Sequence, residues 1–513
     1  MKHALDVTRA QNFPEWYQAV VQQADLAETS PVRGCMIVKP WGYGIWELIQ
    51  AALDRRIKET GHQNCYFPLF IPMSFIAQEA AHVEGFAKEM AVVTHHRLKV
   101  AEGKLVVDPE SALEEPLIVR PTSETIIGDA FRRWVSSHRD LPILINQWAN
   151  VVRWEMRTRM FLRTSEFLWQ EGHTAHASEA EARAETLKML EVYREIAEDA
   201  LAMPVIVGEK PENERFPGAD NTYSIEAMMQ DGKALQAGTS HYLGTNFARA
   251  QNIRFQSASG ELEHCHTTSW GVSTRLVGGV IMTHGDDDGL RLPPKIAPQQ
   301  VIVVPMLREK PEDAEILAYC EKLARELSGL SALGAPLRAH LDAKPERAAN
   351  KRWDWVRRGA PIILEVGPRD MANDAVTLIR RDRLYEGQKI GSAALSRAEL
   401  LEKTPGLLAE IQAALFAEAK ARRDANIRSD LASFAAIADY FGEEAEDGAG
   451  AFKGFVRAPW ARPTGAELAE VEQRLKASKL TLRNIPLSQG KVAGACVFTG
   501  RAAVEEILIA RAY

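Results

Sequence analysis

The stretch of sequence that decides the fold is residues 150–176, NVVRWEMRTRMFLRTSEFLWQEGHTAH. It begins with an apolar lead-in, continues through a short segment rich in arginine, and ends in a second run with the spacing of a strand. Two strand-like runs joined by a polar connection predict a β-hairpin. Because side chains alternate between the two faces of a strand, we expect Arg153 and Glu155 to share one face of the first strand.

The second strand of the predicted hairpin carries aromatic and acidic side chains at alternate positions. Phe167, Trp169 and Glu171 are therefore expected to share one face. An arginine that faces a cleft can hold phosphoryl oxygens through two hydrogen bonds, and a flat ring nearby can stack on a nucleobase. The alternative is an ordinary amphipathic hairpin with a solvated basic tip.

Length and composition are those of a globular protein with several domains. The 513 residues suggest about three domains at roughly 100–200 residues each. With 62 Lys and Arg against 69 Asp and Glu, the net charge is −7, which excludes a histone-like protein but not a nucleic-acid binder. The five cysteines form no CxxC pair, as in a reducing cytosol. No apolar run reaches the ~18 residues of a membrane span, and the N-terminal segment lacks the apolar stretch of a signal peptide.

A proline-rich stretch divides the chain. Residues 290–300, LRLPPKIAPQQ, are expected to form a linker. After it, apolar runs at 301–307, 361–367 and 375–381 are interspersed with helical segments, which predicts a small α/β domain with a largely parallel sheet. The predicted domains are residues 1–297, 298–405 and 406–513.

Other segments also bear on the fold. Residues 40–61 predict a long helix, and residues 65–72 predict a strand. From about Leu407 the chain becomes helical, and we expect the basic stretch at 419–428 to be a solvated helix face. The run HGDDD at 284–288 is either a metal site or a solvated turn, and we expect the turn.

The run at 150–176 resembles motif 2 of class II aminoacyl-tRNA synthetases, and the likeness extends along the chain. PTSET (121–125) is similar to the amino-acid-binding segment of the prolyl enzymes, and QAGTSHYLGTNFA (236–248) is similar to their ATP and proline contact segment. Residues 214–229, 270–294 and 351–370 resemble the loop between motifs 2 and 3, motif 3, and the anticodon-binding domain. The likeness covers nearly the whole chain, and several motifs are specific to prolyl-tRNA synthetases, here in the archaeal/eukaryotic-like form.

The resemblance implies the α+β catalytic domain of class IIa, an antiparallel sheet flanked by helices, followed by an α/β anticodon-binding domain and a small α+β C-terminal domain. The implied activity is ATP-dependent ligation of L-proline to the 3′ end of tRNA(Pro) through prolyl-adenylate, with Mg²⁺ accompanying ATP. It also implies a cytoplasmic homodimer whose interface includes 40–61 and 65–72. We expect no metal site in the chain, no DNA partner and no membrane partner.

The activation chemistry indicates which residue types the site needs. The carboxylate of proline is already anionic when it attacks the α-phosphate of ATP, so catalysis requires positioning and charge rather than a general base. The resemblance assigns the catalytic roles to Arg153 and Arg275. It implies ATP contacts from Arg153, Glu155, Thr164, Phe167, Gln236, Thr239, Ser273 and Arg275. It implies proline contacts from Thr122, Glu124, Arg153, Phe216, His241 and Trp270, and anticodon contacts from Glu365, Arg369 and Arg380.

The sequence departs from some relatives in two places. Only about a hundred residues separate Glu171 from Trp270, so we expect no bacterial-type editing insertion. The last predicted domain has Cys496 as its single cysteine and no histidine, too few ligands for a structural zinc site. We expect the zinc-binding type of domain without its zinc. Tyr513 corresponds to a terminal tyrosine that reaches toward the active site in relatives; the alternative is a frayed terminus.

Other functions and roles stay open at this point. A sister enzyme for threonine or histidine would share the fold, although the PTSET and GTSH segments favour proline. A regulatory protein of synthetase ancestry would be expected to have lost the motif arginines, whereas Arg153 and Arg275 are both present. Taken singly, Glu124 could cap a helix, and Glu365 and Arg369 could lie at a solvated sheet edge.

The expected lack of an editing insertion leads to a prediction about alanine. Alanine is smaller than proline, and an apolar pocket rejects a smaller ligand by only ~1–3 kcal/mol. We therefore expect alanine to be attached to tRNA(Pro) at a measurable rate, with no clearance unless a separate deacylase is added. Parallel charging assays with labelled alanine and proline measure this. Alanine charging below detection would contradict the prediction.

Overall fold

The structure is a computed structural model that describes residues 3–78, 89–311, 313–442 and 452–513. Its centre is an eight-stranded sheet with the strand order β29–β11–β12–β13–β16–β10–β9–β3. Neighbouring strands are antiparallel except for β3 and β9, so the predicted antiparallel sheet is present. The strands are β3 (Gln63–Asn64), β9 (Ile143–Val152), β10 (Glu166–His176), β11 (Val205–Glu209), β12 (Asn221–Met228), β13 (Ala234–Gly244), β16 (His266–Ser273) and β29 (Ile485–Pro486).

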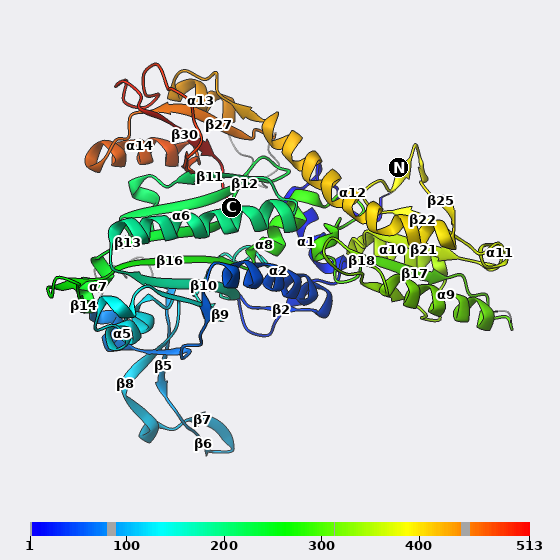
Figure 1. The fold of residues 1–513 in the computed structure, drawn as a ribbon, viewed down its shortest axis with the longest axis horizontal. Helices are drawn as coiled ribbons and strands as arrows, with labels where there is room; N and C mark the ends of the chain where they lie inside the picture. Colours follow the sequence, from blue (N-terminus) through cyan, green and yellow to red (C-terminus); the bar gives the residue numbers. More distant parts are fainter. Residues whose placement is uncertain (1–2, 79–88, 312, 443–451) are drawn as a thin grey trace.

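Helices pack against one face of this sheet and build the main hydrophobic core (Figure 1). The longest contact is made by α6, which begins with a capping box between Ser178 and Glu181. None of the helices in the described ranges has both the length and the apolar composition that a bilayer crossing requires. The helices of this layer are α1 (Phe13–Gln23), α2 (Pro40–Glu59), α6 (Glu179–Glu195) and α8 (Arg275–His284).

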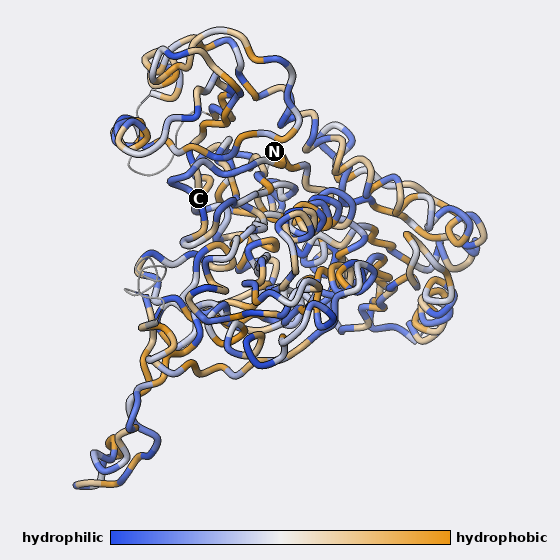
Figure 2. The backbone as a smooth tube through the Cα atoms, turned by 60° about the vertical axis from the view of Figure 1, so that its left-hand side comes forward, coloured by the Kyte–Doolittle hydropathy of each residue, from blue (hydrophilic) through white to orange (hydrophobic). Residues whose placement is uncertain are grey.

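An arm extends from the catalytic domain (Figures 1 and 2). A three-stranded sheet forms its base, and the β6–β7 hairpin forms its tip. The helix predicted at 40–61 is confirmed by α2, whereas only the end of the predicted strand at 65–72 is a strand, β4. The arm contains β4 (Phe70–Pro72), α3 (Met73–Gln78), β5 (Ala91–His95), β6 (Leu98–Ala101), β7 (Lys104–Val107) and β8 (Ala112–Val119); α5 (Glu124–Trp134) follows.

The region predicted to bind the anticodon contains a five-stranded sheet in the order β20–β17–β21–β22–β25. The strands predicted near 301–307, 361–367 and 375–381 are confirmed. The sheet is only partly parallel, because β22 and β25 run antiparallel to their neighbours. The elements are β17 (Val301–Pro305), α9 (Asp313–Ser328), β20 (Ala339–Leu341), α10 (Ala348–Arg358), β21 (Ile362–Val366), α11 (Pro368–Ala372), β22 (Ala375–Arg380) and β25 (Ala393–Ser396).

A long helix, α12 (Arg397–Asp424), leads into the C-terminal region. It starts ten residues before the predicted helix at Leu407, because Ser396 and Glu399 form a capping box there, and the predicted boundary at 405/406 falls inside it. The C-terminal region also contributes β29 to the central sheet. Its other elements are β26 (Ile427–Arg428), α13 (Phe434–Phe441), β27 (Phe455–Trp460), α14 (Gly465–Ala477), β28 (Thr481–Leu482) and β30 (Glu505–Ala510).

The predicted linker and the basic stretch at 419–428 are both packed against neighbouring parts of the protein. The proline-rich stretch at 290–300 is not an exposed linker, because Ile296 and Ala297 are fully buried in the main core. The basic stretch at 419–428 is not simply a solvated face: Arg422 donates to the carbonyl of Thr283 and Arg423 to that of Val205, at 2.8 and 3.0 Å.

The aspartates of HGDDD form neither a solvated turn nor a cluster of free carboxylates. Asp286 pairs with Arg381, Asp287 pairs with Arg9, and Asp288 is 3% exposed. Charged partners that are distant in sequence therefore replaced the solvent that the local pattern suggested.

Packing of α6 on the sheet leads to a stability prediction. Leu190 is 1% exposed and belongs to the main core, whereas Leu187, on the same helix, is 42% exposed. Leu190→Ala should lower the free energy of unfolding by about 2–5 kcal/mol because it leaves a cavity. Leu187→Ala is the matched control and should change it by less than about 1 kcal/mol. Urea titration followed by circular dichroism measures both; equal losses would show that α6 does not pack as described.

Candidate active site

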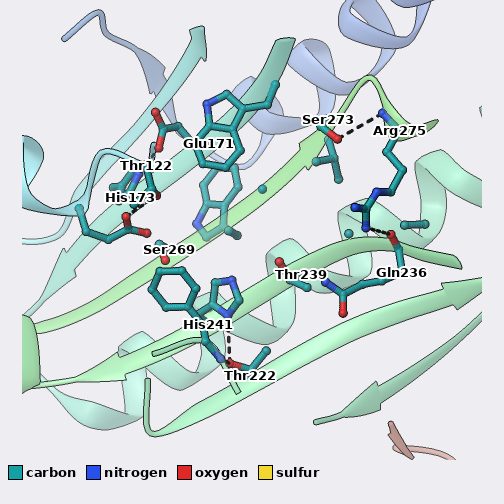
Figure 3. A pocket seen from close by; sticks show the side chains of 18 of the residues that line it. Thr122, Glu171, His173, Thr222, Gln236, Thr239, His241, Ser269, Ser273 and Arg275 are labelled. Atoms are coloured by element: carbon teal, nitrogen blue, oxygen red, sulfur yellow. Dashed lines mark hydrogen bonds and ion pairs between the residues drawn. The ribbon is translucent and has the colours of Figure 1, made fainter. Parts of the chain in front are cut away.

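Two adjoining cavities lie on the face of the sheet opposite α6. The larger has a volume of about 250 Å³ and the smaller about 180 Å³, and they share Arg153, Phe167, Ser273 and Arg275. Figure 3 shows the larger one, with side chains converging from several strands. Of the predicted ATP and proline residues, the larger cavity is lined by Thr122, Glu124, Arg153, Phe167, Phe216, Gln236, Thr239, His241, Trp270, Ser273 and Arg275. Glu155 and Thr164 line the smaller one.

Strand register brings residues that are distant in sequence into rows across the cavity. His173 on β10 pairs with Ser269 on β16, which pairs with His241 on β13. In the next row, Glu171 and Thr239 both lie opposite the same residue of β16. Side chains two apart on a strand point the same way, so both rows face the cavity. The predicted shared face of Phe167, Trp169 and Glu171 agrees with this: all three line the cavity.

Arg153 lies at the junction of the two cavities. It follows the end of β9, so it is not a strand residue sharing a face with Glu155, which lines only the smaller cavity. Its Nε donates to the carbonyl of Pro121 at 3.0 Å. Its guanidinium lies 5.7 Å from the ring centroid of Phe167 and 5.5 Å from that of Trp169. Burial lowers the pKa of Arg153, but nearby carboxylates oppose this, and the side chain stays cationic.

Arg275 begins α8 and supplies the second cation. Its Nε donates to the carbonyl of Leu162 at 3.1 Å, and its Nη1 lies 3.5 Å from the carbonyl of Gln236. Burial, together with the charges of Arg163 and Arg153, lowers its pKa to about 10, so it remains charged at neutral pH. The positive charge of Arg275 adds to the positive end of the helix dipole at the N-terminus of α8. This part of the site therefore attracts a polyanion.

The opposite end of the larger cavity is acidic. Thr122 donates to a carboxylate oxygen of Glu124 at 2.5 Å. Ser123, not Glu124, occupies the N-cap position of α5, and Glu124 is 8% exposed at the cavity wall. Glu124 is thus a carboxylate in the first turn of α5, as the alternative interpretation had it, and it also lines the cavity.

Glu171 and His173 form a buried ion pair behind this acidic end, with 3.0 Å between Oε2 and Nε2. Glu171 also accepts from Ser123 at 2.5 Å and from Gln147 at 2.8 Å. Burial alone would raise the pKa of Glu171, but these hydrogen bonds and the charge of His173 lower it. Burial would likewise lower the pKa of His173, but Glu171 outweighs it and raises that pKa. The proton therefore resides on His173.

An apolar wall completes the cavity. The rings of Phe216 and His241 lie 4.6 Å apart, and Thr222 lies 3.0 Å from Nδ1 of His241. Burial lowers the pKa of His241 to about 3, so its ring is neutral at physiological pH.

Trp270 is among the residues that border the cavity, but its side chain does not project into it. Its ring packs on the helix-covered side of the sheet, 5.0 Å from the ring of His62 and 6.2 Å from that of Tyr193. Strand alternation is the reason: Ser269 faces the cavity, so the next residue faces α6. Gly172 must be a glycine because a Cβ there would lie 2.0 Å from the Trp270 ring.

Sequence reasoning missed several cavity residues. The indole nitrogen of Trp169 and the hydroxyl of Ser269 are buried with no hydrogen-bond partner among the described residues. Period-two spacing pointed to Trp169, whereas nothing local pointed to Ser269, which β-sheet register alone brings here. The other polar lining residues that were not predicted as contacts are Glu171, His173, Glu214, Arg215 and Thr222.

The last residue lies against the loop between β9 and β10. The Tyr513 amide donates to Ala234 at 3.1 Å, and its hydroxyl donates to Asp231 at 2.5 Å. The guanidinium of Arg159, in the loop, lies 5.7 Å from the ring of Tyr513. The terminus is thus anchored and not frayed.

The predicted anticodon residues lie in one sheet region but differ in exposure. Glu365 on β21 is 8% exposed and pairs with Arg352 at 2.9 Å; burial raises its pKa. Arg369, on α11, is exposed. Arg380, at the end of β22, pairs with Asp382 at 2.8 Å and is mostly buried.

Comparisons with known proteins decide the family. A family model described as tRNA synthetase class II core domain (G, H, P, S and T) matches residues 107–284, and one described as anticodon binding domain matches residues 300–403. The proline–tRNA ligase of Sphingomonas elodea is 61% identical, with 100% of each chain covered. That of Sphingopyxis alaskensis is 62% identical, with 100% of this chain and 96% of the relative covered. The chain belongs to the prolyl-tRNA synthetase family.

Solved structures agree with this membership. One solved structure is prolyl-tRNA synthetase from Cryptosporidium parvum in a complex with L-proline and AMP. It superposes on this chain with a TM-score of 0.86 at 35% sequence identity, and the match covers 99% of this chain and 97% of that one. Its complex with halofuginone and AMPPNP gives the same TM-score at 36% identity. The predicted family, fold class and activity are confirmed: this prolyl-tRNA synthetase is an ATP-dependent ligase of proline and tRNA. The sister-enzyme and regulatory alternatives are set aside.

The buried pair of His173 and Glu171 leads to a pH prediction. Because the folded pKa of His173 is raised, its contribution to stability is present below its unfolded pKa of about 6.5 and is lost as pH rises through the folded pKa. His173→Gln should therefore destabilise the protein more at about pH 6 than at about pH 9. Denaturant unfolding at both pH values measures the difference. His96→Gln, at an exposed position, is the control; equal destabilisation by His173→Gln at both pH values would contradict the charged pair.

Proposed function

We propose that the two cavities together form the adenylation site, with proline in the larger one and the ATP phosphates between Arg153 and Arg275. The observation that carries this proposal is the separation of charge along the site. Glu171 lies at one end of the larger cavity and Arg275 at the other (Figure 3), and Arg153 is close enough to Glu124 and Glu171 for their charges to raise its pKa. That order matches an ammonium group, a carboxylate and a polyphosphate laid end to end.

Proline would bind with its secondary ammonium at the acidic end. Glu124 and Thr122 would accept its two N–H donors, since both oxygens border the cavity. The pyrrolidine ring would lie against Phe216 and the neutral ring of His241. The Trp270 side chain is not part of this wall, and Trp169 supplies the aromatic surface that Trp270 was predicted to provide.

ATP would occupy the cationic side and the smaller cavity. Arg153 borders both cavities, so it can hold the proline carboxylate and the α-phosphate together. Arg275 would meet the far phosphates or stack on adenine, and Phe167, in both cavities, would stack on the base. Polar contacts to the nucleotide would come from Glu155, Thr164, Gln236, Thr239 and Ser273.

Catalysis follows from this placement. A carboxylate oxygen of proline attacks the α-phosphorus, a new P–O bond forms, and the bond to the β-phosphate breaks, releasing pyrophosphate. The terminal hydroxyl of tRNA then attacks the acyl carbon, and AMP leaves. Charge accumulates on the phosphoryl oxygens during the first step, and Arg153 and Arg275 stabilise it without needing to move a proton.

Mg²⁺ would enter with ATP. Glu89 and Glu155 line the smaller cavity, and carboxylate oxygens are the ligands that Mg²⁺ prefers. No three His, Cys, Asp or Glu side chains are grouped as a metal site in the described part of the chain, so ATP phosphates would supply most other ligands. The ion would neutralise part of the negative charge of the phosphates.

The remaining features are proposed as follows. The enzyme is of the archaeal/eukaryotic-like type, lacks an editing insertion, has domains near 1–297, 298–405 and 406–513, and acts in the cytoplasm. Glu365, Arg369 and Arg380 read the anticodon; Glu365 and Arg380 would have to exchange their present partners to do so.

A homodimer is proposed, supported by the uncovered apolar face of the arm. Leu98 and Val107 face each other across the β6–β7 hairpin, as do Val100 and Leu105, and all four are at least half exposed. Figure 2 shows this tip extending from the body. An isolated hairpin with such a face is marginally stable without a partner surface.

Amino-acid-dependent exchange of pyrophosphate into ATP tests the adenylation site. With proline, alanine, cysteine, threonine and histidine in parallel, exchange should be strongest with proline. Arg153→Ala should lower proline-dependent exchange by about 100-fold or more, because it removes a preorganised charge from the transition state. Arg133→Ala, an exposed arginine on α5, is the control and should be unaffected. Exchange that survives Arg153→Ala unchanged would contradict the assignment.

A further inference from the structure

The loop after α8 is joined to the anticodon-binding domain by a buried two-pronged ion pair. The terminal nitrogens of Arg381 donate to the two carboxylate oxygens of Asp286 at 2.6 and 2.7 Å. Arg381 is 1% exposed, and its Nε donates to the carbonyl of Val356 on α10 at 2.8 Å. Arg381 therefore donates hydrogen bonds to both sides of the boundary between the domains. Its two parallel bonds to Asp286 fix the orientation of the two side chains as well as the distance between them.

Backbone contacts bring the same two surfaces very close. The amide of Leu290 donates to the carbonyl of Arg357 at 2.9 Å, and the amide of Leu292 donates to that of Gly359 at 3.1 Å. A Cβ at Gly289, where φ is 125°, would lie 2.6 Å from the Cα of Arg357. Only glycine permits this approach, so the loop lies directly on the end of α10.

Further cations hold the carboxyl end of α8 in place. Arg422 donates to the carbonyl of Thr283, and Arg291 donates to that of His284, at 2.8 and 2.5 Å. Arg291 also forms two hydrogen bonds with Glu418 of α12. The last carbonyls of a helix have no hydrogen-bond donors within the helix. These arginines supply donors, and their positive charge complements the negative end of the helix dipole.

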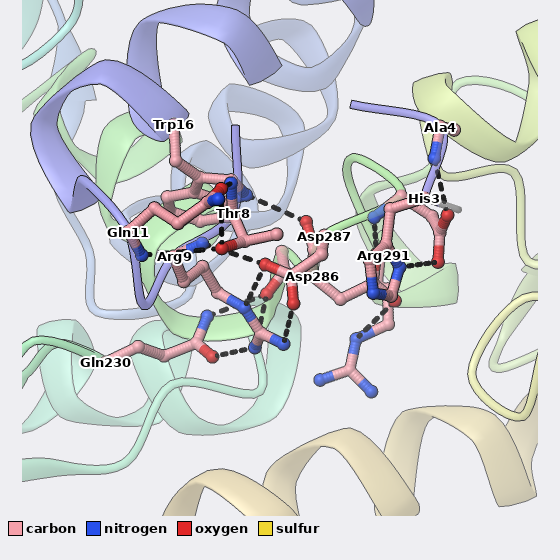
Figure 4. A network of polar contacts seen from close by, with 12 residues as sticks. His3, Ala4, Thr8, Arg9, Gln11, Trp16, Gln230, Asp286, Asp287 and Arg291 are labelled. Atoms are coloured by element: carbon pink, nitrogen blue, oxygen red, sulfur yellow. Dashed lines mark hydrogen bonds and ion pairs between the residues drawn. The ribbon is translucent and has the colours of Figure 1, made fainter. Parts of the chain in front are cut away.

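The N-terminal segment closes this arrangement from the other side (Figure 4). Arg9 pairs with Asp287 at 3.1 Å, and the amide of Ala4 donates to Asp288 at 2.8 Å. Asp287 is thus occupied within the catalytic domain, Asp288 also contacts Tyr385 of the anticodon-binding domain, and Asp286 is the aspartate of this run that pairs with Arg381.

The other end of α8 is Arg275. The helix has ten residues, about 15 Å, and every residue from Leu276 to His284 is buried. A short helix enclosed by a close-packed core moves as one body with its surroundings. One end of α8 therefore lies in the adenylation site, and the loop that follows its other end lies against the domain expected to bind the anticodon.

We propose that Asp286 and Arg381 are positioning residues for the charging of tRNA: their ion pair sets the anticodon-binding domain relative to α8, so that a bound tRNA presents its 3′ end to the adenylate. This inference rests on the proposed role of Arg275 and of the adenylation site. Without the pair, the domain retains its fold but loses a fixed orientation, and transfer to tRNA slows while activation of proline continues.

The double variant Asp286→Asn/Arg381→Gln tests the proposal, because it removes both charges and leaves no buried ion unpaired. Proline-dependent pyrophosphate exchange without tRNA should stay within about twofold of wild type. The concentration of active sites is measured as the amount of prolyl-adenylate formed. Per active site, the kcat for tRNA charging should fall by about tenfold, while the KM for tRNA should change little. Arg381→Lys keeps the charge but not the two-pronged geometry, so its kcat for tRNA charging should lie between those of the wild type and the double variant.

The control is Glu326→Gln/Arg397→Gln, which removes an ion pair of 2.8 Å that lies wholly within the anticodon-binding domain. It should leave both reactions unchanged. Unchanged charging in the Asp286/Arg381 variant would overturn the proposal, as would a parallel fall in exchange and charging. If the double variant does not fold, the kcat and KM of Arg381→Lys decide. Lack of proline-dependent exchange in the wild-type protein would refute the proposed function itself.

Discussion

The antiparallel register of β10, β16 and β13 holds together residues that are about a hundred positions apart in the chain. His173, Ser269 and His241 share one row only because these strands pair in this register. A shift by one residue would turn each row toward α6 and bring core side chains to the cavity. The close contact of the Trp270 ring with Gly172 on the helix-covered side opposes such a shift, because any larger residue at 172 would collide with the ring. Packing on one face of the sheet thus determines the chemistry on the other.

Buried charge is the second feature that shapes the site. Desolvation would neutralise isolated carboxylates and histidines, and it does leave His241 neutral. Glu171 stays ionised because Ser123, Gln147 and His173 surround it. Arg275 retains its charge at neutral pH even though burial, and after it the neighbouring arginines, lower its pKa. The site is therefore polar before any substrate arrives, as electrostatic catalysis requires.

Similar pairing connects the domains. Residues that look like a solvated acidic run, HGDDD, are held by Arg381, Arg9 and the N-terminal segment. The proline-rich stretch that follows is buried and not a free linker. Two such segments in succession make the boundary between the catalytic and anticodon-binding domains a packed interface. The helix α8 begins with Arg275 at the cavity, and the loop that follows it packs on the neighbouring domain.

Local sequence determined a large part of this protein. The hairpin, the long helix α2, the strands β17, β21 and β22, and the set of motif residues all follow from periodicity or from ordered motifs, because these depend on near neighbours in the chain. Tertiary structure decided the rest. It placed Trp270 in the core and Trp169 at the cavity, brought Ser269 to the site, extended α12 across the predicted domain boundary, and paired the aspartates after α8. Each of these depends on which distant segment packs alongside, and neither spacing nor composition of one stretch contains that information.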